Sequence, residues 1–358
     1  ESRGLGDVYK RQVVSFAQAP NKRQELERNE VEILMPVVRE AVERSGIEKK
    51  EIDFICSGSS DVVAGVPFSF VMSLDAAGCW PPVCESHVEM DGAWALYEAW
   101  VKLQVGEQDA ALVYCFGKSS MCNISEVLSL QLDPYYMAPL WPDQMSLAAL
   151  QARLLLEKGQ VSERDLAEVV ARSRRDAKDN PNAQLAGDFQ VEELLAKPMI
   201  ASPLRKHDCA PISDGAAAVV LAAGDLARSA CQRPAWITGI DHRIEAHDLG
   251  VRDLTRSPST ALAAEKAGLG RAPVEVAELY APFSHQELIL REAMGLGEEV
   301  KVNPSGGALS ANAVMAAGLI RIGEAAERIQ NGSASRAVAH ATTGPCLQQN
   351  LLCVLEGR

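Results

Sequence analysis

Apolar residues recur along the chain at two spacings, one helical and one extended. Residues 30–46 (EVEILMPVVREAVERSG) and 92–106 (GAWALYEAWVKLQVG) place apolar side chains three and four positions apart and stop at a glycine. Residues 52–58 (IDFICSG) and 109–117 (DAALVYCFG) are short apolar runs of the kind that forms buried strands. This alternation predicts an α/β fold with a largely parallel sheet covered by helices on both faces.

The alternation is interrupted between residues 119 and 203, where LDPYYMAPLWPDQ, two helical patterns and the polar run PNAQLAGDFQ follow one another. We therefore expect an N-terminal half (13–230) that contains an inserted loop subdomain (119–203), and a C-terminal half (231–358). Residues 1–12 are polar, basic and rich in glycine, and we interpret them as a tail or a cloning remnant outside the fold.

The two halves repeat one pattern. Residues 92–106 form a helical pattern that is followed by a strand at 110–117, and residues 318–332 form one of equal length that is followed by a strand at 336–344. This repetition indicates two duplicated βαβαβ-type units.

Composition narrows the class of protein. A net charge of −13 and a pI of about 5.1 argue against a nucleic-acid-binding surface. We find neither an apolar run of the roughly 20 residues that a membrane span requires nor a secretory leader, and we expect a cytoplasmic protein. The nine cysteines contain no C-x-x-C pair, which favours reduced thiols and no metal site.

Three segments resemble the thiolase superfamily in their order along the chain. Residues 303–329 (NPSGGALSANAVMAAGLIRIGEAAERI) resemble its glycine-rich signature, and residues 202–222 resemble its sterol-carrier-type segment. Residues 278–297 are similar to the stretch around its active-site Asn or His. The resemblance implies the thiolase fold, with layers stacked α/β/α/β/α, and relatives that are acetyl-CoA acetyltransferases or lipid-transfer proteins.

The resemblance predicts a nucleophilic cysteine at the turn EMDG, where this chain has Glu89. Glu89 is either a base or a structural carboxylate that stabilises the turn, and Asp91 is expected to cap the following helix. Cys84 lies five residues earlier on the incoming strand, and we interpret it as a buried structural cysteine.

The other expected catalytic positions also differ from the thiolase pattern. The glycine-rich signature of thiolases continues into Gly-His-Pro, whereas this chain offers Asn312 and lacks the usual base. Tyr280 begins the stretch Tyr-Ala-Pro-Phe, where a sterol-carrier-type thiolase has His-Asp-Cys-Phe. Tyr280 resembles the tyrosine of thiolase-like aldolases, which cleave β-hydroxyacyl-CoA side chains without a cysteine. Tyr280, Glu89, His340 and Asn312 are therefore the candidate catalytic residues, while a packed Tyr280 with a satisfied hydroxyl is the alternative.

The glycine loop supplies the candidate substrate-binding residues. Gly306 and Gly307 would let backbone approach a thioester closely, unless they only form a turn. Asn303 would orient the loop through hydrogen bonds, and Ser310 completes the group. We expect a CoA thioester as substrate and no tightly bound cofactor. Arg205, Lys206 and Arg243 are either partners of the CoA phosphates or solvated surface charges, and we favour the second interpretation for each.

These residues favour an acyl-CoA enzyme that makes or breaks a carbon–carbon bond without an acyl-cysteine. The alternative is a non-catalytic thiolase-fold subunit or lipid carrier that supports a catalytic partner. The resemblance also implies a homodimer, and it implies a complex with a small OB-fold, zinc-ribbon protein. The aromatic run DPYYMAPLWPDQ (133–144) either lines an acyl tunnel, covers a partner surface or forms a small satellite core, and we favour the core.

Overall fold

The computed structural model describes residues 11–357. Ten strands form one mixed sheet in the order β10-β9-β11-β12-β8-β1-β7-β4-β2-β3, and β5 and β6 pair separately. The first five strands in that order belong to the C-terminal half and the last five to the N-terminal half. The two halves meet where β1 pairs with β8.

The N-terminal half contains five strands of the sheet. They are β1 (Arg11–Gln18), β2 (Phe54–Gly58), β3 (Cys84–Val88), β4 (Ala110–Lys118) and β7 (Asp214–Ala223). Its helices are α1 (Glu30–Ser45), α2 (Asp61–Ala64), α3 (Ser69–Ala77), α4 (Gly92–Gln104) and α9 (Gly224–Ala230).

The C-terminal half repeats this order. Its strands are β8 (Ala235–Ile244), β9 (Val276–Leu279), β10 (Lys301–Val302), β11 (Arg336–Thr343) and β12 (Gln349–Gly357). Its helices are α10 (Pro258–Lys266), α11 (Ser284–Met294), α12 (Gly307–Ser310) and α13 (Ala317–Gln330).

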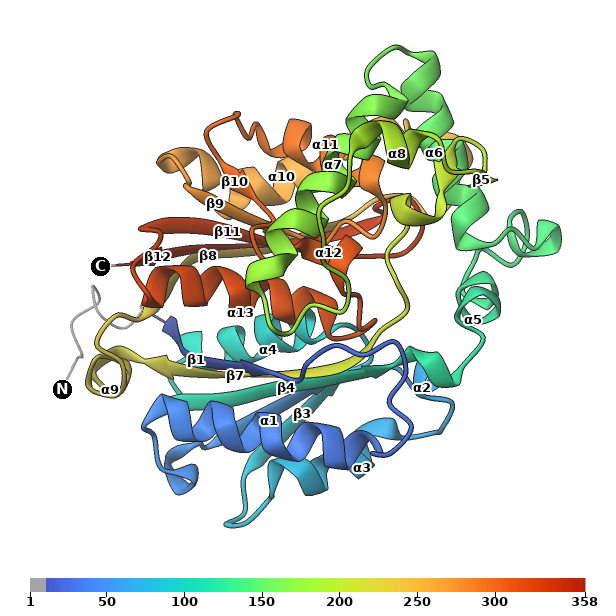
Figure 1. The fold of residues 1–358 in the computed structure, drawn as a ribbon. Coiled ribbons are helices and arrows are strands. Elements are labelled where there is room, and N and C mark those ends of the chain that lie inside the picture. Colours follow the sequence, from blue (N-terminus) through green and yellow to red (C-terminus); the bar gives the residue numbers. More distant parts are fainter. Residues whose placement is uncertain (1–10, 358) are drawn as a thin grey trace.

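The two halves place equivalent strands in equivalent positions, since β3-β2-β4-β7-β1 matches β10-β9-β11-β12-β8. The duplication predicted from the helix–strand repeats is visible as α4 followed by β4 and α13 followed by β11. Figure 1 shows α4 and α13 side by side between the two halves of the sheet, with α1 and α3 on one outer face and α10 and α11 on the other. This is the expected α/β/α/β/α stacking.

The prediction of a largely parallel sheet is wrong in one respect. β2, β3 and β4 run parallel, as do β9, β10 and β11. β7 and β12 run antiparallel to their neighbours and make the sheet mixed. β12 follows β11 directly, and β7 follows β4 after the inserted subdomain.

Local signals explain where the first helix begins and ends. Asn29 caps α1 in a capping box with Glu32, and Gly46 ends it in the left-handed conformation. Apolar residues on one face of α1, such as Leu34 and Ala41, are buried against the sheet. The stop predicted at Gly46 is therefore confirmed.

The insertion leaves the sheet after Lys118 and returns at Asp214, two residues that are paired across β4 and β7. Its elements are α5 (Ile124–Leu130), α6 (Gln144–Glu157), α7 (Glu163–Asp176), α8 (Val191–Leu195), β5 (Met199–Ala201) and β6 (Leu204–Arg205). Between residues 11 and 357 the 3₁₀ turns are Lys49–Glu51, Ser119–Met121, Ala138–Leu140, Ala177–Asp179, Lys206–Asp208, Leu249–Val251 and Leu269–Arg271.

The predicted tail (1–12) differs from the structure at its end. Residues 1–10 lie outside the described residues, but Arg11 and Gln12 are buried and begin β1. Strand β1 is thus two residues longer than the expected boundary allows. The sequence did not reveal this because Arg11 and Gln12 are polar.

Candidate active site

Tyr280 follows β9 and lies between the sheet and α13. Its side chain packs against Ala308 and Ala317, with Ala210 nearby, and is only 6% exposed. Two residues earlier, Glu278 points to the same side and meets Arg321 of α13. Tyr280 therefore faces the layer between the two halves of the sheet.

The phenol of Tyr280 is held in its neutral form. Burial raises its pKa above the usual value for tyrosine, the negative charge of Asp91 adds to this effect, and Arg321 opposes it. At neutral pH the hydroxyl therefore carries its proton. Such a group can donate a hydrogen bond or a proton to a substrate oxygen or carbanion.

A buried ionic cluster lies beneath Tyr280. The Arg321 guanidinium donates to Glu278 at 3.1 Å and to the hydroxyl of Ser305 at 2.7 Å, and that hydroxyl donates to Glu278 at 2.6 Å. Burial raises the pKa of the Glu278 carboxyl against the effect of Arg321. The cluster ties β9, the glycine loop and α13 together below the candidate site.

Asn303 holds the glycine loop in the way the sequence suggests. Its Oδ1 accepts from the backbone N–H of Leu279 at 2.6 Å, and its Nδ2 donates to Glu287 at 2.9 Å. Gly306 has φ +94 and Gly307 φ +60, values that favour glycine. The loop is thus fixed to the end of β9, next to Tyr280.

One side of the glycine loop is covered by the inserted subdomain. A Cβ added to Gly306 would lie 2.6 Å from Cβ of Ala177, and the Ser310 hydroxyl lies 3.2 Å from that of Ser173 on α7. Ser173 also donates to the carbonyl of Gly306. Gly306 and Ser310 therefore contact the inserted subdomain, whereas Ala308 of the same loop packs against Tyr280.

Asn312 ends this loop with an unused acceptor. Its backbone N–H donates to the Ser213 hydroxyl at 2.9 Å, which joins the loop to the start of β7. Among the described residues, nothing donates to its buried Oδ1. Asn312 therefore holds an enclosed, unpaired acceptor next to the start of β7.

Glu89 does not point toward Tyr280. Its side chain is half exposed; Oε1 accepts from the backbone N–H of Asp61 at 2.7 Å, and Oε2 lies 3.3 Å from Nε2 of His87. His87 in turn contacts Ser57 and stacks on Phe70 of α3. These contacts place the Glu89 carboxylate at the edge of the sheet, on the side of α2 and α3.

The carboxylate that reaches the central layer is Asp91. It caps α4 by accepting from Ala93 at 2.8 Å, as predicted, and it also accepts from Gly318 and Leu319 at the start of α13. Burial raises its pKa to about 6, although these backbone hydrogen bonds oppose the shift. Sequence reasoning identified the first cap but missed the second.

His340 lies on the opposite face of the sheet from Tyr280. Its Nε2 lies 3.0 Å from Oδ1 of Asn350, whose Nδ2 donates to Ser259 of the outer helix α10. Burial lowers the pKa of His340 to about 4. The N–H of Tyr280 donates to the carbonyl of His340 at 3.1 Å, and the His340 imidazole also interacts with the backbone of Tyr280.

Cysteines near the candidate turn do not replace the expected thiolate. Cys84 is exposed at the start of the edge strand β3, which corrects our interpretation of it as buried. Cys115 lies under Gly92 at the start of α4, but burial raises the pKa of its thiol well above the usual value. A protonated, fully buried thiol is a poor nucleophile.

Comparison with known proteins identifies the family. The family model described as "Thiolase, N-terminal domain" matches residues 13–225. The chain belongs to the thiolase family.

Relatives and a solved structure agree with this assignment. The chain is 27% identical over 337 residues to an acetyl-CoA acetyltransferase of Methanothermobacter thermautotrophicus, covering 85% of this chain and 87% of the relative. It is 27% identical to sterol carrier protein 2 of Gallus gallus, covering 60% and 45% of the two chains. The solved Ltp2-ChsH2(DUF35) aldolase contains a chain with a TM-score of 0.82 at 18% identity, covering 97% of this chain and 98% of that one. The fold is thus the thiolase fold, and the chain is similar both to an acetyl-CoA acetyltransferase and to a sterol carrier protein 2.

The candidate phosphate partners in this thiolase-family chain are mostly engaged elsewhere. Arg205 is buried and pairs with Glu163, and it also donates to the carbonyl of Lys197. Arg243 pairs with Asp241. Lys206 is exposed. Arg205 therefore has a structural role within the insertion.

The aromatic run of the insertion is largely exposed. Tyr135 is 81% and Trp141 51% exposed, whereas Leu132 and Met137 contribute to a small apolar cluster with α6. The predicted satellite core therefore exists, but the large aromatic side chains lie outside it.

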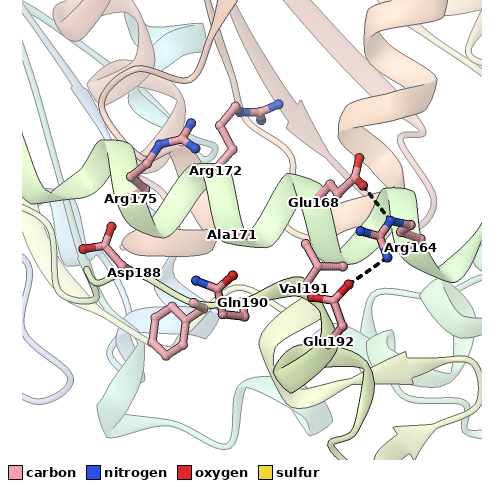
Figure 2. Close-up of a pocket in the computed structure, with 10 residues that line it drawn as sticks. Arg164, Glu168, Ala171, Arg172, Arg175, Asp188, Gln190, Val191 and Glu192 are labelled. Atoms are coloured by element: carbon pink, nitrogen blue, oxygen red, sulfur yellow. Dashed lines mark hydrogen bonds and ion pairs between the residues drawn. The ribbon is translucent and has the colours of Figure 1, made fainter.

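A pocket of about 440 Å³ lies on the outer face of α7, against residues 188–192 (Figure 2). Three arginines line it, and acidic groups neutralise each one: Arg164 with Glu168 and Glu192, Arg172 with Glu287, and Arg175 with Asp176. Each arginine of the pocket is therefore paired with a carboxylate among the described residues, and none of the three is free for a phosphate.

Within residues 11–357, no group of three or more His, Cys, Asp or Glu side chains is arranged to hold a metal ion. The same residues contain no helix with the length and apolar character needed to span a bilayer.

Proposed function

We propose that this chain is a thiolase-fold enzyme that acts on acyl-CoA thioesters and makes or breaks a carbon–carbon bond without an acyl-cysteine intermediate. The observation that carries the proposal is the buried, neutral Tyr280 between the glycine loop and the start of α13. A carboxylate, Glu89, stands at the turn where a thiolase would need a thiol.

Retro-aldol cleavage fits this residue. When the bond between Cα and Cβ of a β-hydroxyacyl thioester breaks, the electron pair stays on Cα as an enolate. The β-hydroxyl loses its proton as it becomes a carbonyl, and Cα must gain one. The β-hydroxyl proton passes to water, neutral Tyr280 supplies a proton to Cα, and water then returns a proton to the phenolate, so the proton count balances without a thiolate.

The enolate needs stabilising donors on the thioester oxygen. The glycine loop is the candidate for this role, because its backbone is fixed by Asn303 and approaches Tyr280 at Ala308. The names of the relatives, an acetyl-CoA acetyltransferase and sterol carrier protein 2, support an acyl-CoA substrate. The aldolase among the structural neighbours supports carbon–carbon cleavage, and the name of the sterol carrier relative supports a role in lipid or steroid side-chain metabolism.

Calorimetric titration with CoA and a panel of acyl-CoAs tests binding, and mass spectrometry of the mixtures tests cleavage. Tyr280→Phe should bind acyl-CoA as the parent does but lose turnover, while Tyr135→Phe, at an exposed tyrosine, should keep it. Intact-mass measurement should detect no acyl adduct on the protein.

A stable acyl adduct on a cysteine would exclude the cysteine-independent route. Acyl-CoA binding without turnover in the parent protein, or no binding at all, would favour a non-catalytic subunit or lipid carrier.

We also propose two assemblies for this chain. β3 is an open edge of the sheet, paired on one side with β2, and it begins with the exposed Cys84 and Glu85. A second copy that adds its own β3 there would give a homodimer, and the exposed aromatic run of the insertion suits a small OB-fold partner. Analytical ultracentrifugation of the chain alone should give a dimer mass, and a monomer mass would contradict this proposal.

We place the protein in the cytoplasm, consistent with the free cysteines of the described residues.

A further inference from the structure

Arg174 is a buried arginine without a counter-ion. It lies on α7 with a relative exposure of 8%. Among residues 11–357 no carboxylate forms an ion pair with it, its side chain makes no hydrogen bond, and its Nε is fully enclosed. The neighbouring Arg172 and Arg175 are both paired with carboxylates, so Arg174 differs from the other arginines of this helix turn.

The surroundings of Arg174 are positive. Burial lowers the pKa of the nearby His207, and the charges of Arg205, Arg174 and Lys197 lower it further, against the effect of Asp208. Asp208 is engaged by the backbone N–H of Arg205 and by the hydroxyl of Ser284. The local carboxylate is therefore committed to other donors.

This position is close to the candidate active site. Ser173, the residue before Arg174, donates to the carbonyl of Gly306. The backbone of Arg174 accepts from Gly187, which folds residues 185–187 over α7. His207 is three residues from Ala210, which contacts Tyr280. Arg174 thus lies between the glycine loop and the segment that leads to Tyr280.

An unpaired guanidinium is costly in such a place. Burial alone lowers its pKa to about 10, so it stays charged at neutral pH without an anion to offset its partly lost hydration. Arginine is the side chain best suited to pair with a carboxylate or phosphate through two hydrogen bonds. A ligand that brings an anion here would recover the lost interactions.

We propose that Arg174 binds an oxyanion of the acyl-CoA substrate and so determines which thioesters are accepted. The inference rests on the proposed function. The oxyanion belongs either to a phosphate of CoA or to a carboxylate carried by the acyl group, and the two sources share the same charge-assisted hydrogen bonds.

Binding measurements on the full chain separate these sources. Acetyl-CoA, succinyl-CoA, S-acetylpantetheine and S-succinylpantetheine are titrated into the parent, Arg174→Met and Arg174→Lys. The matched control is Arg153→Met, at an exposed, paired arginine of α6. If the oxyanion is a phosphate of CoA, Arg174→Met should lower the affinity for both CoA esters about 10- to 100-fold and leave the affinity for the pantetheine esters unchanged. If it is a carboxylate of the acyl group, Arg174→Met should lower the affinity for the two succinyl esters only. Arg174→Lys should recover part of the affinity in either case.

Two further measurements make the inference refutable on its own. Because the unpaired charge costs free energy in the unliganded protein, Arg174→Met should melt at the same temperature as the parent or higher. A melting temperature lower by many degrees would show that Arg174 supports the fold and would overturn the proposal. Equal affinities of Arg174→Met and Arg153→Met for every ester would overturn it as well.

Failure of the proposed function would give a different result. Pyrophosphate should raise the melting temperature of the parent and of Arg153→Met but not that of Arg174→Met. If the parent binds none of the esters but retains this response, the anion site stands and the acyl-CoA function falls. If the parent shows neither ester binding nor the pyrophosphate response, both proposals fall.

Discussion

The carboxylate of Asp91 accepts a hydrogen bond of 2.8 Å from the backbone N–H of Gly318, and this contact joins the two halves of the chain. Asp91 caps α4 in the N-terminal half, and Gly318 lies in the first turn of α13 in the C-terminal half. The carbonyl of Met315 also accepts from Gly92 at 2.9 Å. The two central helices thus begin at one shared set of hydrogen bonds.

Replacing Asp91 by alanine should remove the N-terminal capping hydrogen bonds of both α4 and α13. We expect Asp91→Ala to lower the free energy of unfolding by about 3 kcal/mol, since one cap is worth about 1 kcal/mol and the lost acceptor leaves buried N–H groups unpaired. Urea denaturation measures this change. Asp143→Ala, which removes the single cap of α6, is the matched control and should cost about 1 kcal/mol. Equal costs for the two variants would contradict the shared cap.

The glycine loop should not tolerate a side chain at Gly306. Gly306 has a positive φ, and Ala177 and Ser310 lie close to it. Gly306→Ala must therefore displace the end of α7 from the loop, and we expect the free energy of unfolding to fall by about 3 kcal/mol. Gly295→Ala is the control, because Gly295 also has positive φ but no atom within 4 Å of the added Cβ. Its cost should be about 1 kcal/mol, from the backbone alone. Thermal unfolding of both variants checks the difference, and the two losses should not be equal.

Acid should destabilise the protein through His340. Its pKa is about 4 in the folded chain and about 6.5 when unfolded, so between these values the unfolded chain binds more protons and stability falls as the pH falls. The stabilising contribution of the neutral His340 imidazole is fully present above pH 6.5. Between pH 7 and pH 5 we expect the free energy of unfolding of the parent to fall by about 2 kcal/mol more than that of His340→Gln. Urea titrations at the two pH values measure it, and identical pH dependence in parent and variant would refute it.

Glu89 should be dispensable for turnover. Its carboxylate is half exposed and accepts from the backbone of Asp61, and the amide oxygen of a glutamine can accept the same hydrogen bond. We expect Glu89→Gln to change kcat for carbon–carbon cleavage by less than about threefold, since removal of a general acid or base costs about 100-fold or more. Steady-state kinetics beside Tyr280→Phe decides this. A loss in Glu89→Gln as large as in Tyr280→Phe would make Glu89 a catalytic residue.

The repeated pattern could be predicted because periodicity encodes it locally. The helix from Gly92 and its counterpart from Ala317 both bury an apolar face, and each is followed by an apolar strand. The direction of β7 and β12 is not encoded in this way. Neither is the position of β3 at the edge of the sheet, which is why Cys84 is exposed rather than buried.

The site was harder to predict, because a strand position does not reveal the face to which its side chain points. Tyr280 and His340 come from neighbouring strands, yet they face opposite layers. At the turn into α4, Asp91 rather than Glu89 reaches the centre, two residues further along. Arg174 had no sequence signal at all, since only the tertiary structure shows that its charge is buried and unpaired.

The inserted subdomain is anchored at a single point of the sheet. It departs after Lys118 and returns at Asp214, and these two residues face each other across β4 and β7. A segment whose ends already meet can lengthen, shorten or be replaced without altering the register of the strands. The inserted subdomain, which contains α7 and Arg174, can therefore vary during evolution while the duplicated core and Tyr280 remain the same.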